Sequence, residues 1–481
     1  MFTVLGNFIA VIMVNKALCY TSLMPRKKRV VADLSSIVSL CKRRGFIFPG
    51  SEIYGGLANT YDLGPLGVEM LRNIENSWWE SFVHRREDIY GLDTSILMSP
   101  RVWEASGHTK SFSDVLIDCK GCKLRTRADQ LVENYLEKHG EKDKIGGRTP
   151  EGLDELIKNY EIKCPSCGKF DWTPCRNFNL LFETSIGIIP GEKSLVYLRG
   201  ELAQGMFVNF KNILDSVHPK LPLGLAQSSK VFRNEITLGN FVFRTLEFNL
   251  AEFEYFFNPN EKNWMDYFNF WKKEMVKWIV GLGIPQDRFR WRVHTDEERA
   301  HYSERTEDLD FEFPMGYKEL FGIAYRTDYD LRNHMEKSGV DLTYKDHKTG
   351  ENFIPHVVEP TFGLNRVLLA LLVDAYEEDE QRIVLKLDPK VAPYKFAVFP
   401  LVRNKPEIVE KAREVFKYLN KTYNVAWDDR GNIGKRYLSQ DEIGTPYCVT
   451  IDYDTLDDGT VTVRDRDTTE QKRVPFEEIT L

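Results

Sequence analysis

The sequence predicts an α+β protein with a separate α/β domain at its C-terminal end. Residues 231–257 alternate apolar and charged side chains on both sides of a short loop, which is typical of an antiparallel hairpin packed on a core. Other segments space their apolar residues as amphipathic helices do. From Tyr394 onward, strand-like and helix-like segments alternate, which indicates an α/β unit with its own core.

The bulk composition is that of an ordinary globular protein. The chain has 481 residues, a length that fits roughly two to four domains. Its 42% hydrophobic and 28% charged content excludes disordered and fibrous classes. A formal charge of −7 argues against a protein that coats nucleic acid by charge alone, although a local basic surface remains open. The 8 cysteines include two CxxC pairs, which fit metal ligands in a reducing compartment better than a disulfide framework.

Residues 1–29 are predicted to be a leader outside the fold. The segment 1–20 is apolar but interrupted by polar residues, lacks a basic start and is too short for a membrane span. Met24 opens a basic run that looks like the natural start of a cytosolic protein. A signal or organelle-targeting segment is the alternative. We favour the extra leader and expect a cytoplasmic protein with no membrane partner.

Three elements are predicted before residue 90. Residues 30–42 form a helical stripe, 45–49 a short strand, and a long helix begins near Pro65 after the glycine-rich region 51–67. The apolar face of the long helix fits either core packing or a subunit contact. That face consists of Val68, Leu71, Ile74, Trp78 and Phe82.

Two cysteine pairs flank a helical insert at residues 126–160. Four thiolates at this spacing can chelate one tetrahedral zinc ion, and they leave no open position for catalysis. A structural zinc is therefore predicted, with reduced free cysteines as the alternative. The candidate ligands are Cys119, Cys122, Cys164 and Cys167.

The elements after the hairpin follow from the same periodicities. Helices are predicted over 263–282, 296–302 and 361–376, and strands over 289–294, 309–314, 317–324 and 353–360. The C-terminal domain is predicted as strands 396–401, 424–427 and 447–452, helices 406–419 and 433–439, and a hairpin about Asp458-Gly459. The predicted domains are a main domain at 30–389, with an insertion at about 119–175, and a C-terminal domain at 390–481.

Charged residues recur along the 231–257 hairpin at every second or third position. If one face of the hairpin packs on a core, these charges point into a shared cavity. Two arginines and several carboxylates in one cavity suggest a site for an anionic ligand and a small amine. The residues are Arg233, Glu235, Arg244, Glu247, Glu252 and Glu254.

Three segments together resemble the signature motifs of class II aminoacyl-tRNA synthetases, most closely the homodimeric glycyl-tRNA synthetase family. They are residues 63–67 with the helix that follows, 232–248, and 359–366. Residues 99–108, 127–129 and 198–205 are similar to segments specific to the glycyl branch. The resemblance covers nearly everything from Val30 to the C-terminus.

The resemblance implies an architecture and a reaction. The expected fold is an antiparallel sheet flanked by helices, with a zinc-ribbon-like insertion and a C-terminal anticodon-binding α/β domain. The expected assembly is a homodimer joined through the helix after Pro65. The implied reaction joins glycine to ATP as glycyl-adenylate, and then transfers the glycyl group to tRNA(Gly).

By the same resemblance, Arg233 holds the α-phosphate of ATP, Glu235 the adenine amino group and Arg366 the γ-phosphate; these are the candidate catalytic residues. Phe248 stacks on adenine, and Glu319 binds magnesium. Attack on a phosphate needs positive charge against developing negative oxygens, which the arginines offer. Plain ion pairs are the alternative. The ATP-binding set is Arg233, Asn234, Glu235, Phe243, Arg244, Thr245, Leu246, Glu247, Phe248, Glu319, Leu320, Gly363, Leu364, Asn365 and Arg366.

A glycine pocket must exclude every larger amino acid and fix the ammonium group, so it needs no editing domain. The glycine-binding set implied by the resemblance is Arg127, Glu201, Phe248, Glu252, Glu359, Thr361 and Gly363. A helix cap or surface carboxylate is the alternative for Glu201. The chain departs from the usual family pattern at Gly200, Leu202, Thr361 and Asn365, which affects the fit around glycine rather than the adenylate chemistry.

Two other functions compete with a glycine–tRNA ligase. One is a non-catalytic, synthetase-like accessory subunit that binds nucleic acid, a class that usually loses the motif arginines kept here at 233, 244 and 366. The other is a class II synthetase for another small amino acid, against which the glycyl-specific segments argue.

Overall fold

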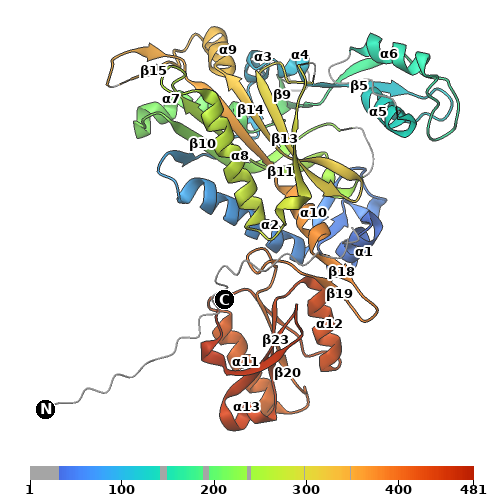
Figure 1. The fold of residues 1–481 in the computed structure, drawn as a ribbon, viewed down its shortest axis with the longest axis vertical. Helices are drawn as coiled ribbons and strands as arrows, with labels where there is room; N and C mark the ends of the chain where they lie inside the picture. The colour runs from blue at the N-terminus through green and yellow to red at the C-terminus, as the bar shows by residue number, and fades with distance from the viewer. Residues whose placement is uncertain (1–31, 141–148, 188–193, 236–239, 297, 347) are drawn as a thin grey trace. The chain divides into compact units, whose positions relative to one another are not determined.

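The computed structural model describes residues 32–140, 149–187, 194–235, 240–296, 298–346 and 348–481. The expected leader, residues 1–29, lies outside this range. The chain divides into two compact units (Figure 1). One holds residues 32–393 with 441–444, and the other holds 394–440 with 445–481.

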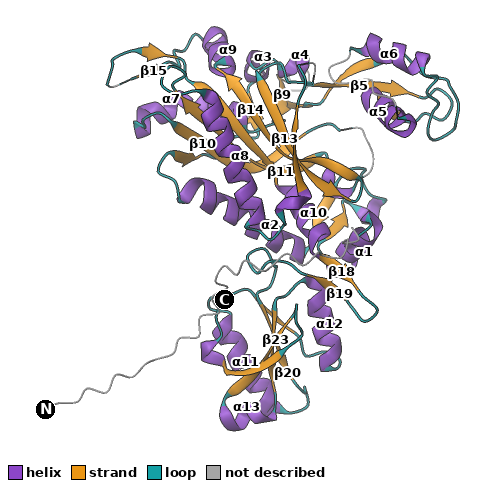
Figure 2. Ribbon diagram, viewed as in Figure 1, coloured by secondary structure: helices purple, strands orange, loops and turns teal. Residues whose placement is uncertain are grey.

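A seven-stranded sheet forms the centre of the larger unit. Neighbouring strands are antiparallel except for the parallel pair β10 and β3. Helices flank this sheet (Figure 2), which confirms the α+β prediction. In sheet order the strands are β12 (Phe289–Val293), β13 (Arg305–Phe313), β14 (Gly316–Thr327), β17 (His356–Gly363), β11 (Glu247–Phe257), β10 (Leu223–Phe232) and β3 (Ile89–Gly91).

Alternation along β11 divides its side chains between two layers. Phe253 packs against Trp78 and Trp271, which belong to helices on one face of the sheet. Phe256 packs against Phe207 and Phe210 of a helix on the other face. The first face is covered by α2 (Pro65–Trp79), α8 (Trp264–Val280) and α10 (Leu364–Ala375), and the second by α7 (Ala203–Val217) and α9 (Tyr329–Ser338).

An insertion follows the short helices α3 (Pro100–Ala105) and α4 (His108–Ser111). Its apolar core lies between a three-stranded sheet and two helices, with Ile117, Val132 and Leu153 fully buried. The elements are β5 (Ser113–Asp118), β6 (Arg125–Arg127), α5 (Ala128–His139), α6 (Pro150–Asn159) and β7 (Arg176–Asn179). A second small sheet joins β4 (Leu97–Met98), β9 (Ser194–Leu198) and β8 (Phe182–Ile186).

The smaller unit is an α/β domain, as the sequence predicts. Its sheet has the order β21-β20-β22-β23-β24, with the first three strands parallel. The strands are β20 (Phe396–Pro400), β21 (Val425–Trp427), β22 (Tyr447–Ile451), β23 (Thr460–Asp465) and β24 (Gln471–Pro475). The helices are α11 (Pro406–Leu419), α12 (Ile433–Ile443), which ends at residues grouped with the larger unit, and α13 (Tyr453–Asp458).

Three local predictions were wrong. The segment about Asp458-Gly459 is not a hairpin, because Asp452 and Thr455 form a capping box that starts α13 and Gly459, at φ +73, ends it. Residues 298–302 form turns rather than a helix. The helix expected at 361–376 begins at Leu364, because residues 361–363 still pair with β11 and belong to β17.

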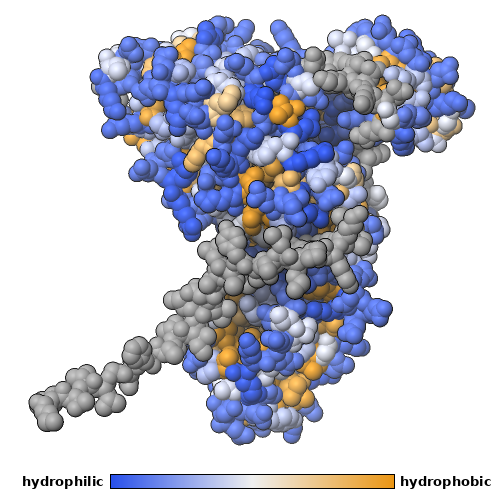
Figure 3. Space-filling model, in the orientation of Figure 1, coloured by the Kyte–Doolittle hydropathy of each residue, from blue (hydrophilic) through white to orange (hydrophobic). Residues whose placement is uncertain are grey.

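The remaining elements are short. They are α1 (Leu34–Arg44), β1 (Ile47–Pro49), β2 (Tyr61–Leu63), β15 (Tyr344–Lys345), β16 (Asn352–Phe353), β18 (Tyr376–Glu378) and β19 (Ile383–Leu385). No helix within the described residues is long and apolar enough to span a membrane. The face drawn in Figure 3 is mostly hydrophilic, with scattered hydrophobic spots.

Gly67 permits the close contact between α2 and the chain at Phe46. A Cβ added at Gly67 would lie 1.9 Å from the Phe46 carbonyl oxygen, so the backbone would have to move. We expect Gly67→Ala to lower the free energy of unfolding of the larger unit by about 2–3 kcal/mol, measured by urea denaturation. Gly322→Ala in β14 is the control within the same unit, because its nearest contact would be an ordinary 3.9 Å to Asp308. Equal denaturation of the two variants would contradict the packing argument.

Candidate active site

A pocket with an empty volume of about 570 Å³ opens on the central sheet. Strands β11, β14 and β17, the segment between β10 and β11, and the start of α10 all contribute to it. It is lined by Arg233, Glu235, Val242, Phe243, Arg244, Thr245, Phe248, Leu250, Glu319, Leu320, Thr361, Gly363, Asn365 and Arg366.

Most residues of the predicted ATP-binding set line this pocket, but four do not. The backbone N–H of Asn234 donates to Leu180, and that of Leu246 donates to Asn59. Glu247 pairs with Lys230 at 3.3 Å, and Leu364 is completely buried. Two lining residues, Val242 and Leu250, were absent from both the predicted ATP-binding set and the predicted glycine-binding set. Both are apolar positions that fit core packing equally well, so the sequence carried no signal for them.

The three motif arginines hold different positions in the pocket. The Arg233 guanidinium donates to the Gly200 carbonyl at 3.0 Å and lies 5.5 Å from the Phe248 ring centre. Arg366 lies 3.1 Å from the Glu319 carboxylate and 4.5 Å from the Phe243 ring centre.

Arg244 lies beside Glu235 in the pocket wall. Burial lowers the pKa of this guanidinium, and its Nε lies 3.7 Å from Glu235. Its Nη1 has no hydrogen-bond partner within the described part of the chain. Guanidinium groups that keep unused donors beside aromatic rings suit a ligand with both anionic and planar aromatic parts.

A buried ionic network lies on the same face of the sheet. At its centre is Arg326 of β14, which is 0% exposed. Its Nε and Nη2 donate to Asp330 at 2.8 and 2.9 Å, and its Nη1 donates to Glu359 at 2.8 Å. Its Nη2 lies 3.8 Å from Glu201. Arg326 is the main residue that the sequence prediction missed.

Glu201 is held by two further groups. Nε2 of His108 lies 3.0 Å from its carboxylate, and Nε2 of Gln204 donates to it at 2.9 Å. Burial alone would raise the pKa of Glu201, but His108 and Arg326 outweigh burial and hold that pKa below its ordinary value. Glu201 is therefore a buried ionised carboxylate, not the surface or capping residue of the alternative reading.

The predicted glycine-binding residues fall into separate groups. Phe248, Thr361 and Gly363 line the open pocket, whereas Glu201 and Glu359 belong to the buried network. Glu252 on β11 is directly opposite Thr361 on β17, so it joins the two regions. Arg127 pairs instead with Asp114 and Asp129, each at 3.0 Å.

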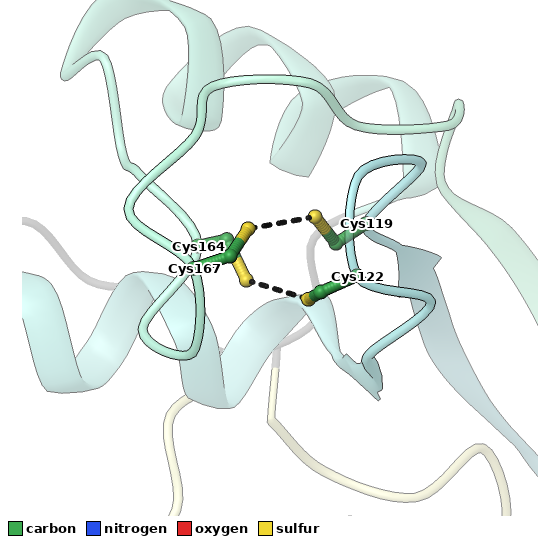
Figure 4. A group of neighbouring side chains, drawn as sticks. All are labelled: Cys119, Cys122, Cys164 and Cys167. Carbon is green, nitrogen blue, oxygen red and sulfur yellow. Dashed lines mark hydrogen bonds between the residues drawn. The ribbon is translucent and has the colours of Figure 1, made fainter.

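The four cysteines of the insertion converge from two loops (Figure 4). Cys119 and Cys122 lie between β5 and β6, and Cys164 and Cys167 lie between α6 and β7. The Sγ atoms of Cys119 and Cys167 are 3.6 Å apart, as are those of Cys122 and Cys164. A tetrahedral zinc ion with Zn–S bonds of about 2.3 Å needs sulfur atoms roughly 3.8 Å apart. The cluster therefore fits zinc.

Comparison with known proteins gives a consistent result. The anticodon-binding domain family matches residues 395–480. The chain is 50% identical over 454 residues to a glycine–tRNA ligase of Caldanaerobacter subterraneus subsp. tengcongensis, covering 94% of this chain and 97% of the relative. It is 50% identical to that of Geobacillus kaustophilus over 94% of this chain and 98% of the relative. It is 48% identical to that of Bacillus anthracis over 93% and 97%.

The identity of about 50% extends over nearly the whole chain. It agrees with the arginine-lined pocket, the buried acidic network and the C-terminal α/β domain. The resemblance seen in the sequence motifs is thereby confirmed. The chain belongs to the glycine–tRNA ligase family of aminoacyl-tRNA synthetases.

Proposed function

We propose that the protein attaches glycine to tRNA(Gly) through a glycyl-adenylate formed from glycine and ATP. The observation that carries this mechanism is the adjacency of two unlike regions. A pocket with arginines and aromatic rings adjoins a buried acidic network, and the pair Glu252 and Thr361 lies between them. The first region suits a nucleotide and the second an ammonium group. The non-catalytic alternative has no observation in its favour.

ATP is assigned to the open pocket. Arg233 would neutralise charge that develops on the α-phosphate as the glycine carboxylate attacks, and Arg366 would hold the terminal phosphate. Phe248 would stack on adenine, with Glu235 near its amino group. Magnesium would be held by Glu319, a carboxylate 47% exposed in the pocket, and would neutralise phosphate charge when bound.

Glycine is assigned to the boundary between the pocket and the network. Glu252 and Glu359 would hold its ammonium, because a carboxylate is the natural partner for a buried cation. Thr361 places a methyl group and a hydroxyl at this boundary, where the added bulk would exclude larger amino acids. Glu201 is tied to His108, Gln204 and Arg326, so it acts by positioning the network.

The partners follow from the assigned reaction. The unit at residues 394–481 would bind the anticodon arm of tRNA(Gly), in keeping with its match to the anticodon-binding family. The helix α2 would join two copies in a homodimer. The location proposed with this reaction is the cytoplasm, and no membrane partner is assigned. The insertion would carry one structural zinc ion on its four thiolates.

The first test is pyrophosphate exchange with Arg233→Ala. We expect glycine-dependent ATP–pyrophosphate exchange to fall by about 10²–10³-fold, because one charge is lost from the reacting phosphate. Arg290→Ala is the matched control, since Arg290 lies on β12 of the same sheet and pairs with Asp310 outside the pocket. Near-normal exchange by Arg233→Ala would refute the role of this arginine.

The second test is a panel of amino acids in the same exchange assay. We expect activity with glycine and at least about 10²-fold less with alanine or serine, because the pocket must reject one added group by steric exclusion. Exchange with alanine or serine but not glycine would refute the specificity. No exchange with any amino acid would refute the enzyme assignment.

The third test is metal analysis of the purified protein. We expect about one zinc per chain, because four thiolates at these distances complete a tetrahedral shell. Cys119→Ser should lose the zinc and lower the melting temperature. Cys175→Ala is the control, because Cys175 lies in the same insertion outside the cluster and should keep the zinc. A zinc-free wild type that retains its stability in chelator would contradict the site.

A further inference from the structure

Three buried carboxyl groups crowd together between β11 and β17. Glu252 and Glu254 are two residues apart on β11, so both point to the face that carries Glu359. Their exposed fractions are 1%, 0% and 6%. One oxygen from each lies within 4.8 Å of the other two. Glu254 has no role in the function proposed above.

The surroundings do not supply enough positive charge for this cluster. The elements packed around it bring the carboxylates of Glu201, Asp330 and Asp93, and the cations are Arg326, Arg199 and, when protonated, His108. Tyr302 and His334 also face this network, and Gln204 and Gln227 are its neutral neighbours. Six carboxyl groups against three cations leave an excess of three negative charges, which a buried site cannot hold without bound protons or another cation.

The hydrogen bonding of the carboxyl oxygen atoms also indicates that the cluster holds protons. Neither carboxyl oxygen of Glu254 has a hydrogen-bond partner among the described residues, and neither does Oε1 of Glu252. Glu252 and Glu359 each place a carboxyl oxygen within 4.8 Å of one on the other, and in a buried setting a shared proton removes the repulsion between two like charges. Burial, and then the Glu359 carboxylate, raise the pKa of both Glu252 and Glu254 well above the ordinary value.

We propose that the enzyme without glycine keeps protons on Glu254 and on the Glu252–Glu359 pair, and that the ammonium group of glycine displaces the shared proton of that pair. Glu254 stays a neutral acid and acts as a positioning residue beside Glu359. The exchange balances: one ammonium ion enters, one O–H bond breaks, and one proton leaves to solvent. The ammonium therefore replaces the positive charge that the proton supplied to the carboxyl pair, while the carboxylate of glycine is directed toward Arg233 in the open pocket. This inference rests on the proposed placement of glycine at Glu252 and Glu359.

Competition between a proton and the ammonium has a measurable consequence. Below the pKa of the shared proton, the affinity for glycine rises about tenfold per pH unit, because each binding event must expel one proton. Above that pKa the affinity no longer depends on pH. A pocket of permanently ionised carboxylates would bind glycine equally well throughout this range.

The decisive experiment is calorimetric titration of the full-length protein with glycine at about pH 6.5, where the carboxylate and ammonium of glycine are both charged. The titration is repeated in buffers with different ionisation enthalpies. We expect release of about one proton per glycine bound by the wild type. Glu252→Gln should bind more weakly and release none. Binding without proton release by the wild type would overturn the proposal.

Glu254→Gln tests the neutral acid directly, because an amide has the shape of a protonated carboxyl group. The pKa of Glu254 is raised in the folded protein, so the unfolded chain gains by ionising once the pH passes about 4.3, and the wild type loses stability as pH rises. The melting temperature of Glu254→Gln should exceed that of the wild type by about 2 °C or more at about pH 7.5. The advantage should shrink toward about pH 5.5.

A control variant shows whether a change in melting temperature is specific to Glu254. Glu274→Gln alters a solvent-accessible carboxylate on α8 that pairs with Lys277, and should change the melting temperature little at either pH. A Glu254→Gln variant less stable than the wild type at neutral pH would show an ionised Glu254 and refute the proposal. A metal ion that stays bound to the three carboxyl groups after chelator treatment would also refute the proposal. If the wild type shows no glycine-dependent ATP–pyrophosphate exchange, the proposed function on which the inference rests is refuted instead.

Discussion

The buried guanidinium of Arg326 holds the acidic side of the site together. It joins four separate pieces of chain, because its donors reach Asp330 on α9 and Glu359 on β17 and it faces Glu201 before α7 from its own strand, β14. A charged group at 0% exposure is tolerated only when its hydrogen bonds are satisfied, and Arg326 meets this requirement with carboxylates alone. Its ring neighbour Tyr302, at 3.7 Å, closes the remaining side.

This arrangement fixes the acids more tightly than a solvent-exposed pocket would. Glu201 and Glu359 cannot rotate away from the pocket without breaking bonds to Arg326, His108 or Gln204. Preorganised charge costs no rearrangement when a ligand arrives, which is how buried polar networks contribute to specificity. The basic side of the site differs, because Arg233 and Arg366 line an open pocket. One sheet thus carries a rigid acidic region and an accessible basic one.

Local periodicity predicted the elements but not all of their ends. The alternation of β11 and the helical stripe of α2 were visible in the sequence because burial imposes periods of 2 and about 3.6 residues. The pairing of Arg233 with Arg366, 133 positions later, came from the family resemblance, since no local pattern links two such distant residues. The segment at 453–459 was predicted wrongly because Asp-Gly is typical of a hairpin turn. The capping box at Asp452 instead stabilises the first turn of a helix.

Arg326 could not be found from the sequence for a physical reason. The predicted strand stopped at residue 324, and the register of β14 against β17 shifts between Tyr325 and Thr327. A bulge of this kind re-aims a side chain and breaks the alternation that would have shown which face the arginine takes. The cysteine cluster was the opposite case, because the spacing of its two pairs was sufficient to bring all four sulfur atoms into one candidate site.

The strand β11 sets a fixed distance within the site. Phe248, assigned to adenine, and Glu252, assigned to the ammonium, are four residues apart on one strand and share one face. Their Cα atoms are therefore separated by about 13 Å along a strand that rises roughly 3.3 Å per residue. Insertion or loss of a single residue between them would turn one of the two side chains to the opposite face of the sheet. The length of this short stretch is consequently constrained as strictly as the identity of its residues.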